Sequence, residues 1–292
     1  MKAWFAYLIV ALVWGSTYFA IALGIGSFQT FGMVASRYLA GGCLALLLGR
    51  IAGEAAPSKG DIPHLAFQGF LLLTLSNALV TWAESSVSSG AAAVLCSTSP
   101  LWYAILGREK LGARAWLGLA LGLAGVGVLI LARSGPQTLG LPGVCAIMLA
   151  VVLWVYGTLH GRRHVKGHGL FGQVGVQMLA GGALALLLVP FTGGFLHSPL
   201  TWRAGLAVGY LTIFGSLVAY SAFIYISKVW PPTKMSTYVY INPVVAVLLG
   251  CLFIGEPFNL LMGLGMGIIL LGVALLQTAR PAASGSGACA TE

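Results

Sequence analysis

LAGGCLALLL at residues 39–48 returns as LAGGALALLL at residues 179–188, with one difference in ten positions. Apolar sequence of low complexity can repeat by accident, so neighbouring features must repeat at a similar spacing before a duplication is inferred. Three features do so, at offsets of 140, 143 and 147 residues: Trp14 and Trp154, Ser99-Pro100 and Asn242-Pro243, and Glu109 and Glu256. The chain therefore consists of two copies of one half.

The composition places most of the chain in lipid. Hydrophobic residues make up 59% of the 292 residues, charged residues make up only 7%, and the mean hydropathy is +0.95. The formal charge of +9 could suggest nucleic-acid binding, but the few basic residues are spread between apolar runs and form no basic groove. The five cysteines follow neither a metal-ligand spacing nor a paired framework, so we interpret them as structural.

Apolar runs of about 20 residues, the length that crosses a bilayer as a helix, predict an all-α membrane protein with ten transmembrane helices. The first run is too long for a signal peptide, and nine similar segments follow it. We expect two inverted five-helix repeats, at 1–132 and 140–279, and a disordered tail at 280–292. The predicted spans are 4–25, 30–49, 64–83, 87–106, 114–132, 140–160, 170–191, 204–226, 235–254 and 258–279.

The positions of lysine and arginine predict the orientation in the membrane. If the N-terminus is cytoplasmic, the inner segments carry 12 of the 15 basic residues, the outer loops carry Arg133 and Arg203, and Arg37 lies within a span. Because cytoplasmic loops are enriched in lysine and arginine, we expect both termini to be cytoplasmic.

An odd number of spans per repeat inserts the second repeat upside down relative to the first. Inverted repeats are typical of secondary transporters, because exchanging the conformations of the two halves converts an outward-open cavity into an inward-open one. Channels and membrane enzymes can also be duplicated, but the sequence contains no HExxH motif, P-loop, nucleophile triad or paired carboxylates. The pattern favours a transporter and disfavours both an enzyme and an ATP-driven pump.

Polar and aromatic residues at helical spacing on the first, third and eighth spans indicate faces turned away from lipid. For a single serine or threonine, hydrogen bonding between helices is the simpler explanation. For the asparagines and the mid-span tryptophans we favour a cavity wall, since tryptophan usually prefers the membrane interfaces. The predicted substrate-binding residues are Trp14, Thr17, Asn77, Thr81, Ser99, Trp102, Tyr103, Trp154, Tyr220, Tyr238 and Asn242.

Four residues have a predicted structural or gating role: Arg37, Glu84, Pro100 and Pro243. The two prolines either make packed kinks or free backbone carbonyls toward a cavity, and both interpretations stay open. An arginine inside a span needs a partner. The candidates for Arg37 are a helix-end carbonyl, Glu84, or the carboxylate of a zwitterionic substrate, and Gln177 holds the equivalent place in the second repeat.

Several motifs together carry a family resemblance: residues 14–17 (WGST), Arg37, the small residues 88–93, and a proline followed by an acid in each repeat. They resemble the EamA-type branch of the drug/metabolite transporter superfamily, and most closely its YddG-type aromatic amino-acid exporters, although Arg108-Glu109 departs from the family's Gly-Glu. The resemblance implies a basket of ten helices in which spans 1–4 and 6–9 line a cavity and spans 5 and 10 lie outside it. It also favours a structural role for Arg37, which is widespread in the family.

Two tempting motifs receive a structural interpretation. The pairs Gly118/Gly122 and Gly263/Gly267 have the small-xxx-small spacing of close helix packing, and no strand precedes them as a dinucleotide site requires. His160, His164 and His168 recur every four residues among glycines and basic residues, which indicates a cationic cytoplasmic loop. We predict no metal site and no cofactor.

The functional expectation is an alternating-access exporter of amino acids with aromatic or large apolar side chains, in a bacterial inner membrane. The alternatives are a carrier of nucleotide sugars, phosphate esters or organic cations, and a membrane enzyme or scaffold. Phosphate substrates would call for several cavity cations and organic cations for a buried acid, whereas the spans offer only Arg37 and Glu84. The expected partners are a small amino-acid-like solute and the lipid bilayer, without nucleic acid, for a monomer or weak homodimer.

Overall fold

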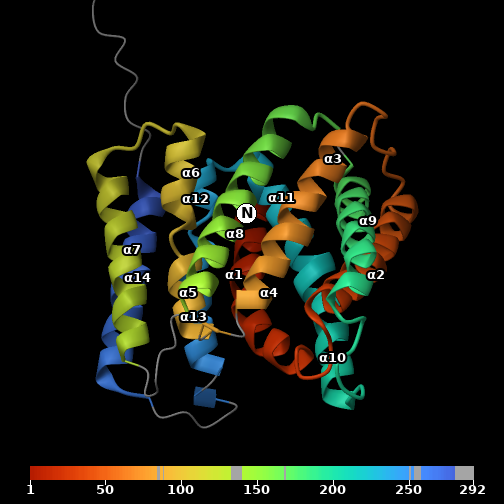
Figure 1. Cartoon of the computed structure of the whole chain (residues 1–292). Helices are drawn as coiled ribbons and strands as arrows, with labels where there is room; N and C mark the ends of the chain where they lie inside the picture. The colour runs from red at the N-terminus through yellow and green to blue at the C-terminus, as the bar shows by residue number, and fades with distance from the viewer. Residues whose placement is uncertain are drawn as a thin grey trace, which may run out of the picture.

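The computed structural model describes residues 1–83, 86–87, 89–132, 140–167, 169–249, 251–252 and 258–279. Within these ranges the regular elements are helices and no β-strand forms, apart from an isolated antiparallel bridge between Phe28 and Leu196. The helices run side by side, and the loops between them gather at two opposite ends of the bundle (Figure 1). The predicted all-helical fold is confirmed.

The two repeats contain corresponding helices. The first comprises α1 (Lys2–Gly24), α2 (Thr30–Ile51), α3 (Ile62–Gly69), η1 (Phe70–Ser76), α4 (Asn77–Ala83), α5 (Ser89–Cys96), α6 (Ser99–Gly107) and α7 (Ala113–Leu131). The second comprises α8 (Leu141–His164), α9 (Leu170–Leu188), η2 (Val189–Thr192), α10 (Trp202–Tyr210), η3 (Leu211–Val218), α11 (Ala219–Val229), α12 (Pro232–Met235), α13 (Tyr238–Leu249) and α14 (Leu260–Thr278).

Eight helical stretches of the described chain are long and apolar enough to cross a membrane, and they match eight of the predicted spans. The predicted span 87–106 is instead divided into α5 and α6 by a turn at Ser97 and Thr98. Pro100 lies in the first turn of α6, where its missing N–H removes no helical hydrogen bond. It therefore begins a helix here and does not kink one.

The predicted span 235–254 is also divided, but at another place. A turn at Ser236 and Thr237 separates the short α12 from α13, and Pro243 lies inside α13. A proline inside a helix removes one backbone hydrogen bond and bends the axis. The two equivalent prolines thus serve different local structures, and a crossing by each of the ten predicted spans stays a prediction.

The repeated stretches that open the sequence pack against each other as α2 and α9. A Cβ added to Gly42 would lie 2.9 Å from the backbone nitrogen of Leu179, and one added to Gly182 would lie 2.8 Å from that of Leu39. At the offset of 140 residues, Gly42 corresponds to Gly182 and Leu39 to Leu179, so the two contacts are equivalent under the repeat. The glycines therefore let α2 and α9 approach backbone to backbone about a local two-fold axis.

A second glycine contact joins α7 to α14 beside the rest of the bundle (Figure 1). The predicted packing role is confirmed for Gly118, where a Cβ would lie 2.8 Å from the carbonyl oxygen of Gly272. The predicted packing role is wrong for Gly267, where a Cβ would meet no atom of another element within 4 Å in the described part of the chain. Gly265 and Gly272 instead face α7, because rotation of α14 about its axis, which spacing alone does not reveal, decides which glycines meet the neighbour.

The third helix of each repeat changes its winding at the same place. The π-helical segment η1 follows α3, and the π-helical segment η3 follows α10, 141 residues later. The side-chain amide of Asn77, the first residue of α4, donates to the carbonyl oxygen of Leu72 in η1, 2.8 Å away and five residues earlier. A π-helical turn contains more residues than an α-helical turn and often occurs at functional sites, so residues beyond it face a different direction than α-helical spacing predicts.

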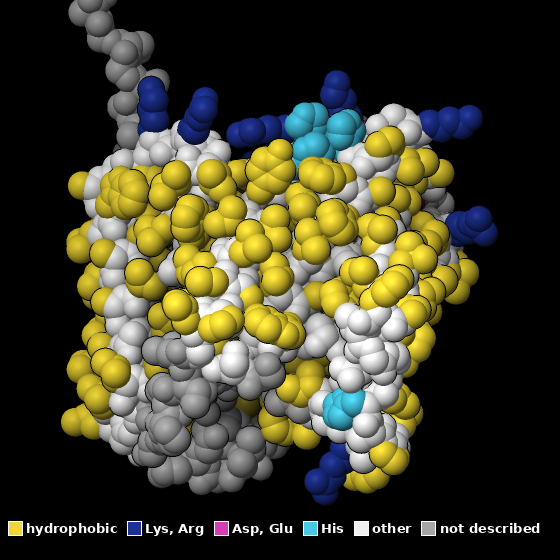
Figure 2. Space-filling view, in the orientation of Figure 1, with side chains coloured by type: hydrophobic (Ala, Val, Ile, Leu, Met, Phe, Trp, Pro, Cys, Tyr) yellow, Lys and Arg dark blue, Asp and Glu magenta, His cyan; other side chains and the backbone are white. Residues whose placement is uncertain are grey.

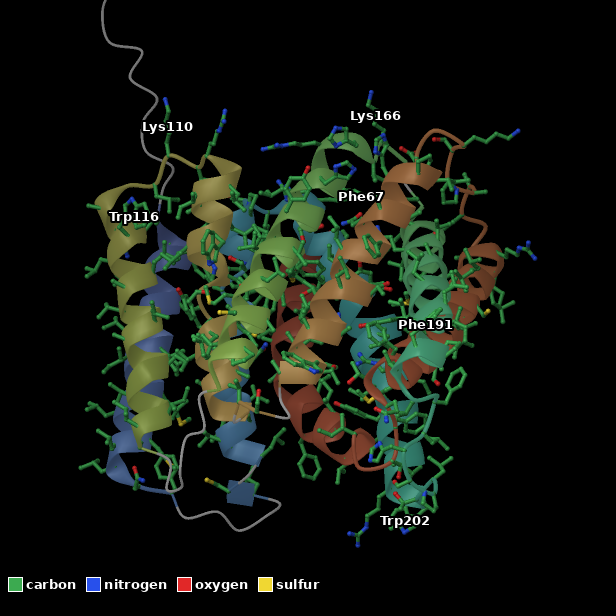
Figure 3. The ribbon with its side chains drawn as sticks, in the orientation of Figure 1. Phe67, Lys110, Trp116, Lys166, Phe191 and Trp202 are labelled. Atoms are coloured by element: carbon green, nitrogen blue, oxygen red, sulfur yellow. The ribbon has the colours of Figure 1, made fainter. Side chains whose placement is uncertain are left out.

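The face of the molecule in Figure 2 carries apolar side chains across its middle and most of its Lys and Arg side chains at one end. Large hydrophobic side chains such as Phe19, Leu187 and Leu270 are exposed, which suits contact with lipid. Lys110 and Lys166 lie at one end and Trp202 at the opposite end (Figure 3). We call the first of these the basic end, since most of the Lys and Arg side chains visible in Figure 2 gather there.

Carboxylates of the first repeat hold the second repeat near the basic end. Glu54 accepts hydrogen bonds from the backbone nitrogens of Phe171 and Gly172, at 2.8 and 3.2 Å, in the first turn of α9. Glu109 accepts one from the nitrogen of Thr233, at 3.0 Å, in the first turn of α12. Because the N-terminus of a helix presents unpaired N–H groups and a partial positive charge, carboxylates bind it well.

Candidate substrate cavity

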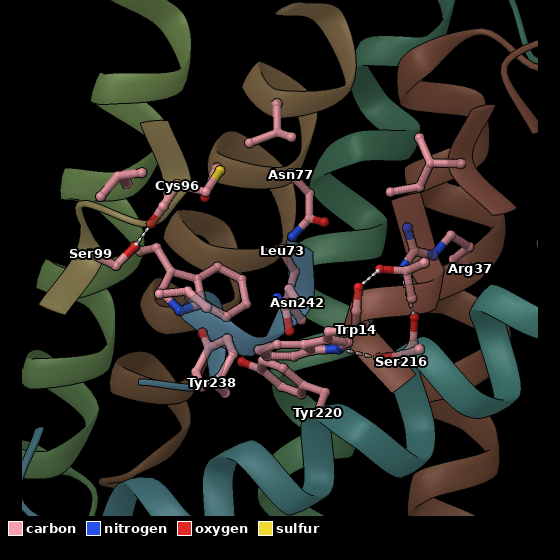
Figure 4. Close-up of a pocket in the computed structure, with 18 of the residues that line it drawn as sticks. Trp14, Arg37, Leu73, Asn77, Cys96, Ser99, Ser216, Tyr220, Tyr238 and Asn242 are labelled. Carbon is pink, nitrogen blue, oxygen red and sulfur yellow. Dashed lines mark hydrogen bonds between the residues drawn. The ribbon is translucent and has the colours of Figure 1, made fainter. Parts of the chain in front are cut away.

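A cavity between the two repeats collects side chains from helices that are far apart in the sequence (Figure 4). About 140 Å³ of it is open to the centre of a water-sized sphere, whereas a single water needs only about 10–15 Å³ by this measure. The cavity therefore has room for a small solute. Its lining residues are Trp14, Thr17, Ile21, Arg37, Tyr38, Leu73, Ser76, Asn77, Val80, Cys96, Ser99, Val151, Trp154, Gly215, Ser216, Tyr220, Tyr238, Val239 and Asn242.

Aromatic rings form one wall of the cavity. The ring of Trp14 on α1 meets that of Trp154 on α8 edge to face, with centroids 5.5 Å apart, and meets that of Tyr238 in the same way at 5.1 Å. Phe223 packs behind both tryptophans, at 5.2 and 5.3 Å. These spacings lie within the range favoured by aromatic pairs, so the wall is a packed unit drawn from both repeats.

Hydrogen bonds fix the position of the Trp14 ring. Its Nε1 donates to the carbonyl oxygen of Gly215 in η3, at 2.9 Å. The neighbouring Thr17 hydroxyl donates back to the Trp14 carbonyl, at 2.8 Å. Trp154 differs, because its Nε1 is buried and meets no hydrogen-bond acceptor within the described chain. One wall tryptophan is therefore held by the backbone, while the other keeps an unused donor.

Arg37 supplies the positive charge of the cavity. Its side chain is 5% exposed, donates through one terminal nitrogen to the Ser216 hydroxyl at 3.2 Å, and lies with its guanidinium carbon 5.1 Å from the centroid of the Tyr38 ring. Its Nε has no hydrogen-bond partner in the described chain. An arginine inside a span is costly unless it is paired, and the contacts with Ser216 and Tyr38 leave donor capacity unused.

Polar groups face the cavity from the other helices. Asn77 on α4, Ser99 at the start of α6 and Asn242 on α13 all line it. The Asn242 amide is placed so that its nitrogen donates to the carbonyl oxygens of Tyr238 and Ala11, at 3.0 and 3.1 Å, which directs its own carbonyl oxygen elsewhere. In Figure 4 Ser99 lies on the side of the cavity opposite Arg37 and Ser216, with Asn77 between them.

A short chain of hydrogen bonds extends from the cavity into the contact between the repeats. The Tyr220 hydroxyl donates to Oε1 of Gln177, at 2.7 Å, and Nε2 of Gln177 donates to Oε1 of Gln68, also at 2.7 Å. Gln177 occupies the place in α9 that Arg37 occupies in α2. The repeat symmetry thus places a charged donor at one position and, at the other, a neutral amide whose oxygen and nitrogen each have a hydrogen-bond partner.

The structure brings most of the predicted binding residues together, except Trp102 and Tyr103 on α6 and Thr81 on α4. Tyr103 is fully buried and its hydroxyl donates to Oγ1 of Thr158 at 3.0 Å, while Trp102 packs against the hydrophobic core. Thr81 is buried outside the lining. Among the predicted gating residues, Glu84 lies outside the described residues. The lining residues that were predicted are Trp14, Thr17, Asn77, Ser99, Trp154, Tyr220, Tyr238 and Asn242.

The differences follow from breaks in helical winding. The turn before Ser99 starts a new helix, α6, so only its first residues face the cavity and Tyr103 turns toward α8. The π-helical segment η1 places Leu73 and Ser76 in the lining, while Thr74 donates to the carbonyl oxygen of Gly181 on α9 at 2.7 Å. Ser216 was already part of the polar stripe on the eighth predicted span.

A second, wider groove lies between α1 and α10, with about 510 Å³ open to the centre of a water-sized sphere. Its lining is mostly apolar and includes Phe19, Leu23 and Trp202, which are exposed on the outside of the bundle. Of its polar lining residues, Ser16 and Tyr210 hydrogen-bond each other and Arg203 is exposed. The narrower cavity between the repeats has more polar side chains converging on it and is therefore the candidate substrate site.

Comparison with known proteins adds to this geometry. A model of the EamA-like transporter family matches residues 1–131 and 141–278. The chain belongs to the EamA-like transporter family. This EamA-like protein is 35% identical over 274 residues to the uncharacterized inner membrane transporter YedA of Escherichia coli strain K12, a match that covers 92% of this chain and 88% of YedA.

A more distant relative has a named substrate. A probable terminal-alkyne amino-acid exporter of Streptantibioticus cattleyicolor is 26% identical to the EamA-like protein, with 94% of this chain and 93% of the relative covered. A crystal structure with 21% sequence identity has the same fold, with a TM-score of 0.76 over 94% of this chain and 95% of the other. The predicted family is confirmed, and the chain is a transporter of that family.

Proposed function

We propose that this EamA-like protein exports amino acids with aromatic or large apolar side chains across a bacterial inner membrane by alternating access. The observation that carries the proposal is the pairing of an aromatic wall with one buried cation in a single cavity. An amino acid can place its carboxylate on Arg37 and its side chain against Trp14 and Trp154. Carboxylates match the fork of donors of a guanidinium.

The charge of the lining argues against the alternative substrates. Arg37 is the only cation among the lining residues of the described chain, whereas a phosphate ester or nucleotide sugar would call for several. The same lining contains no carboxylate to neutralise an organic cation. An amino acid needs one cation for its carboxylate, and its ammonium group can use aromatic faces and neutral oxygens such as those of Asn77 and Asn242.

The contact between the repeats supports the proposed mechanism. The pairs Gly42 with Leu179 and Gly182 with Leu39 are equivalent under the 140-residue offset, so either repeat can adopt the packing of the other at similar cost. The cavity lies between the repeats and is lined from both. A relative movement of the repeats would therefore open it toward one side while closing it toward the other.

Counterflow in liposomes tests this function. Purified protein should accelerate uptake of labelled phenylalanine when unlabelled phenylalanine is inside, and should transport leucine or methionine more slowly. An aromatic pair adds about 0.5–1.5 kcal/mol, which corresponds to about two- to tenfold selectivity. Trp154→Ala should reduce phenylalanine transport more than threonine transport, while the exposed Trp202→Ala should leave the ratio unchanged. The absence of counterflow with every amino acid tested would refute the proposal.

A further inference from the structure

Three histidines from both repeats meet at the basic end. His64 lies on α3 of the first repeat, and His160 and His164 lie one turn apart near the end of α8 in the second. One ring nitrogen of each lies within 4.8 Å of the other two. Figure 2 shows histidine side chains gathered among lysines and arginines at this end. Sequence spacing grouped His160 and His164 with His168, which lies outside the described residues, whereas the fold brings in His64.

We propose that His64, His160 and His164 form a binding site for a divalent transition metal, Zn²⁺ in the first place, that links the two repeats. Imidazole nitrogen is a good ligand for zinc, nickel and copper. Zinc lies about 2.0–2.1 Å from such nitrogens in a tetrahedral arrangement, which sets the ligand nitrogens about 3.4 Å apart. Nδ1 of His64 and Nε2 of His160 are already 3.1 Å apart.

The third histidine already lies beside the other two. The rings of His160 and His164 are stacked with centroids 4.3 Å apart, and the ring of His164 is also stacked on that of His64 at 4.9 Å. Histidines at positions i and i+4 of a helix project from one face, as metal-binding pairs do. Since the ligand nitrogens lie within 4.8 Å of one another, they need to close by about 1.4 Å or less to reach the spacing of a tetrahedral zinc site.

The surroundings select suitable tautomers. Nδ1 of His164 lies 3.0 Å from the carbonyl oxygen of His160, so it donates its proton there and leaves the Nε2 lone pair for a metal. Metal-ligating histidines commonly donate their second N–H to a carbonyl in this way. The edge-to-face contact of Phe67 with His160, at 5.0 Å, restrains that ring. His164 is exposed, so water can fill a fourth coordination position.

Nearby charges set the strength of the site. Three basic residues near the histidines repel a dication: Arg162 and Arg163 lie between His160 and His164, and Lys166 follows them. The carboxylate of Asp61, three residues before His64, attracts one, although it accepts hydrogen bonds from the Ser58 hydroxyl and the Lys166 nitrogen. We expect a weaker site than a structural zinc centre, one that fills as the metal concentration rises and empties as it falls.

A metal at this place would join two elements that line the cavity. The helix α3 continues into η1, which carries Leu73 and Ser76, and α8 carries Trp154 six residues before His160. The bound metal would hold the two repeats together at the basic end. If the repeats move as proposed above, metal binding should slow transport. This consequence rests on the proposed function, whereas metal binding itself does not.

Calorimetric titration with Zn²⁺ tests the site in the full-length protein, after removal of metal with EDTA. We expect one equivalent to bind. His64→Gln, His160→Gln and His164→Gln should each weaken binding by at least about tenfold, since loss of even an outer-shell partner costs about 10–100-fold. His197→Gln, an exposed histidine outside the cluster, is the control and should bind like the wild type. Equal affinity in the three site variants, or a comparable loss in His197→Gln, would overturn the site.

Two further readouts separate binding from folding and from transport. Unfolding temperatures without metal should agree among the variants, and Zn²⁺ should raise that of the wild type but not that of His64→Gln. In counterflow, Zn²⁺ should slow the wild type, EDTA should restore it, and His64→Gln should be insensitive. A wild type that binds Zn²⁺ yet transports equally with it contradicts the coupling. The absence of counterflow altogether contradicts the proposed function and leaves the calorimetric result standing.

Discussion

Arg37 illustrates how much a single residue depends on its surroundings. Its isolation among apolar residues marks it as exceptional in the sequence, and the family resemblance favoured a structural role. In the structure it lines the cavity and contacts Ser216 and Tyr38, yet its Nε meets no partner in the described chain. A side chain that only stabilised helix packing would be expected to use its donors fully, so the unpartnered Nε supports the proposed contact with a substrate carboxylate.

Replacing this residue distinguishes the two roles. Hydrogen bonds to charged groups contribute about 1.5–3 kcal/mol, so Arg37→Gln should raise the KM for phenylalanine about 10- to 100-fold. Inhibition of counterflow by phenylethylamine, which lacks the carboxylate, should change little. The exposed Arg203→Gln serves as the matched control. If Arg37→Gln instead lowers the unfolding temperature and weakens both ligands alike, the residue is structural.

Residue types allowed a partial prediction of the site. Trp14, Trp154, Asn77 and Asn242 are unusual in the middle of membrane helices, and each of them lines the cavity. Trp102 is equally unusual but is not part of the lining. Residue type identifies side chains that avoid lipid. Such a side chain can face either a neighbouring helix or a cavity. The rotation of the helix about its own axis decides between the two, and the sequence does not give that rotation.

At the scale of the element, eight of the ten spans predicted from hydropathy correspond to long helical stretches. Changes of winding within the helices were not predicted. The π-helical segments η1 and η3 occur in sequences as apolar as their surroundings, and nothing in residue order distinguishes them. The segment η1 packs against α8 and α9, and η3 packs against α2, α11 and α1. On the third span, Thr74 within η1 bonds to α9 and only Asn77, just after η1, lines the cavity as predicted.

The glycine contact between α2 and α9 makes a symmetric prediction about stability. In Gly182→Ala or Gly42→Ala the new methyl would lie within 3 Å of a backbone nitrogen, and such overpacking costs about 1–3 kcal/mol. Both variants should unfold at lower temperature, by similar amounts. The control is Gly127→Ala on α7, which meets no atom within 4 Å and should not be destabilised. A large effect in only one of the paired variants would contradict the symmetric packing.

The loop carboxylate of Asp61 predicts a pH dependence. The backbone N–H of Lys166 and then the Ser58 hydroxyl hold the pKa of this carboxyl below its ordinary range. The contact therefore stabilises the fold fully above the ordinary pKa of about 3.9 and is lost as pH falls through the lower folded value. Asp61→Asn should lower the unfolding temperature at neutral pH, and the difference from the wild type should shrink below about pH 3.9. A difference that disappears already at pH 6 would contradict this assignment.

For the whole molecule, the distribution of charge predicts orientation. Most of the Lys and Arg side chains visible in Figure 2 lie at one end, and cytoplasmic loops are enriched in such residues. In a cysteine-free background, Lys59→Cys should be protected from an impermeant thiol reagent in intact cells and labelled after lysis. Gly193→Cys, in a loop predicted to lie on the outer side of the membrane, should be labelled in intact cells. The reverse labelling pattern would show that the predicted orientation in the membrane is wrong.

The contact of LAGGCLALLL with LAGGALALLL is self-complementary, because each stretch presents to its partner the same surface that it receives. A chain of half this length could thus form the same seam with a second copy inserted the opposite way up. Such an ancestor would have to enter the membrane in both directions in equal numbers. Gene fusion removes that requirement, and it frees each half to diverge, as Arg37 in one and Gln177 in the other have done.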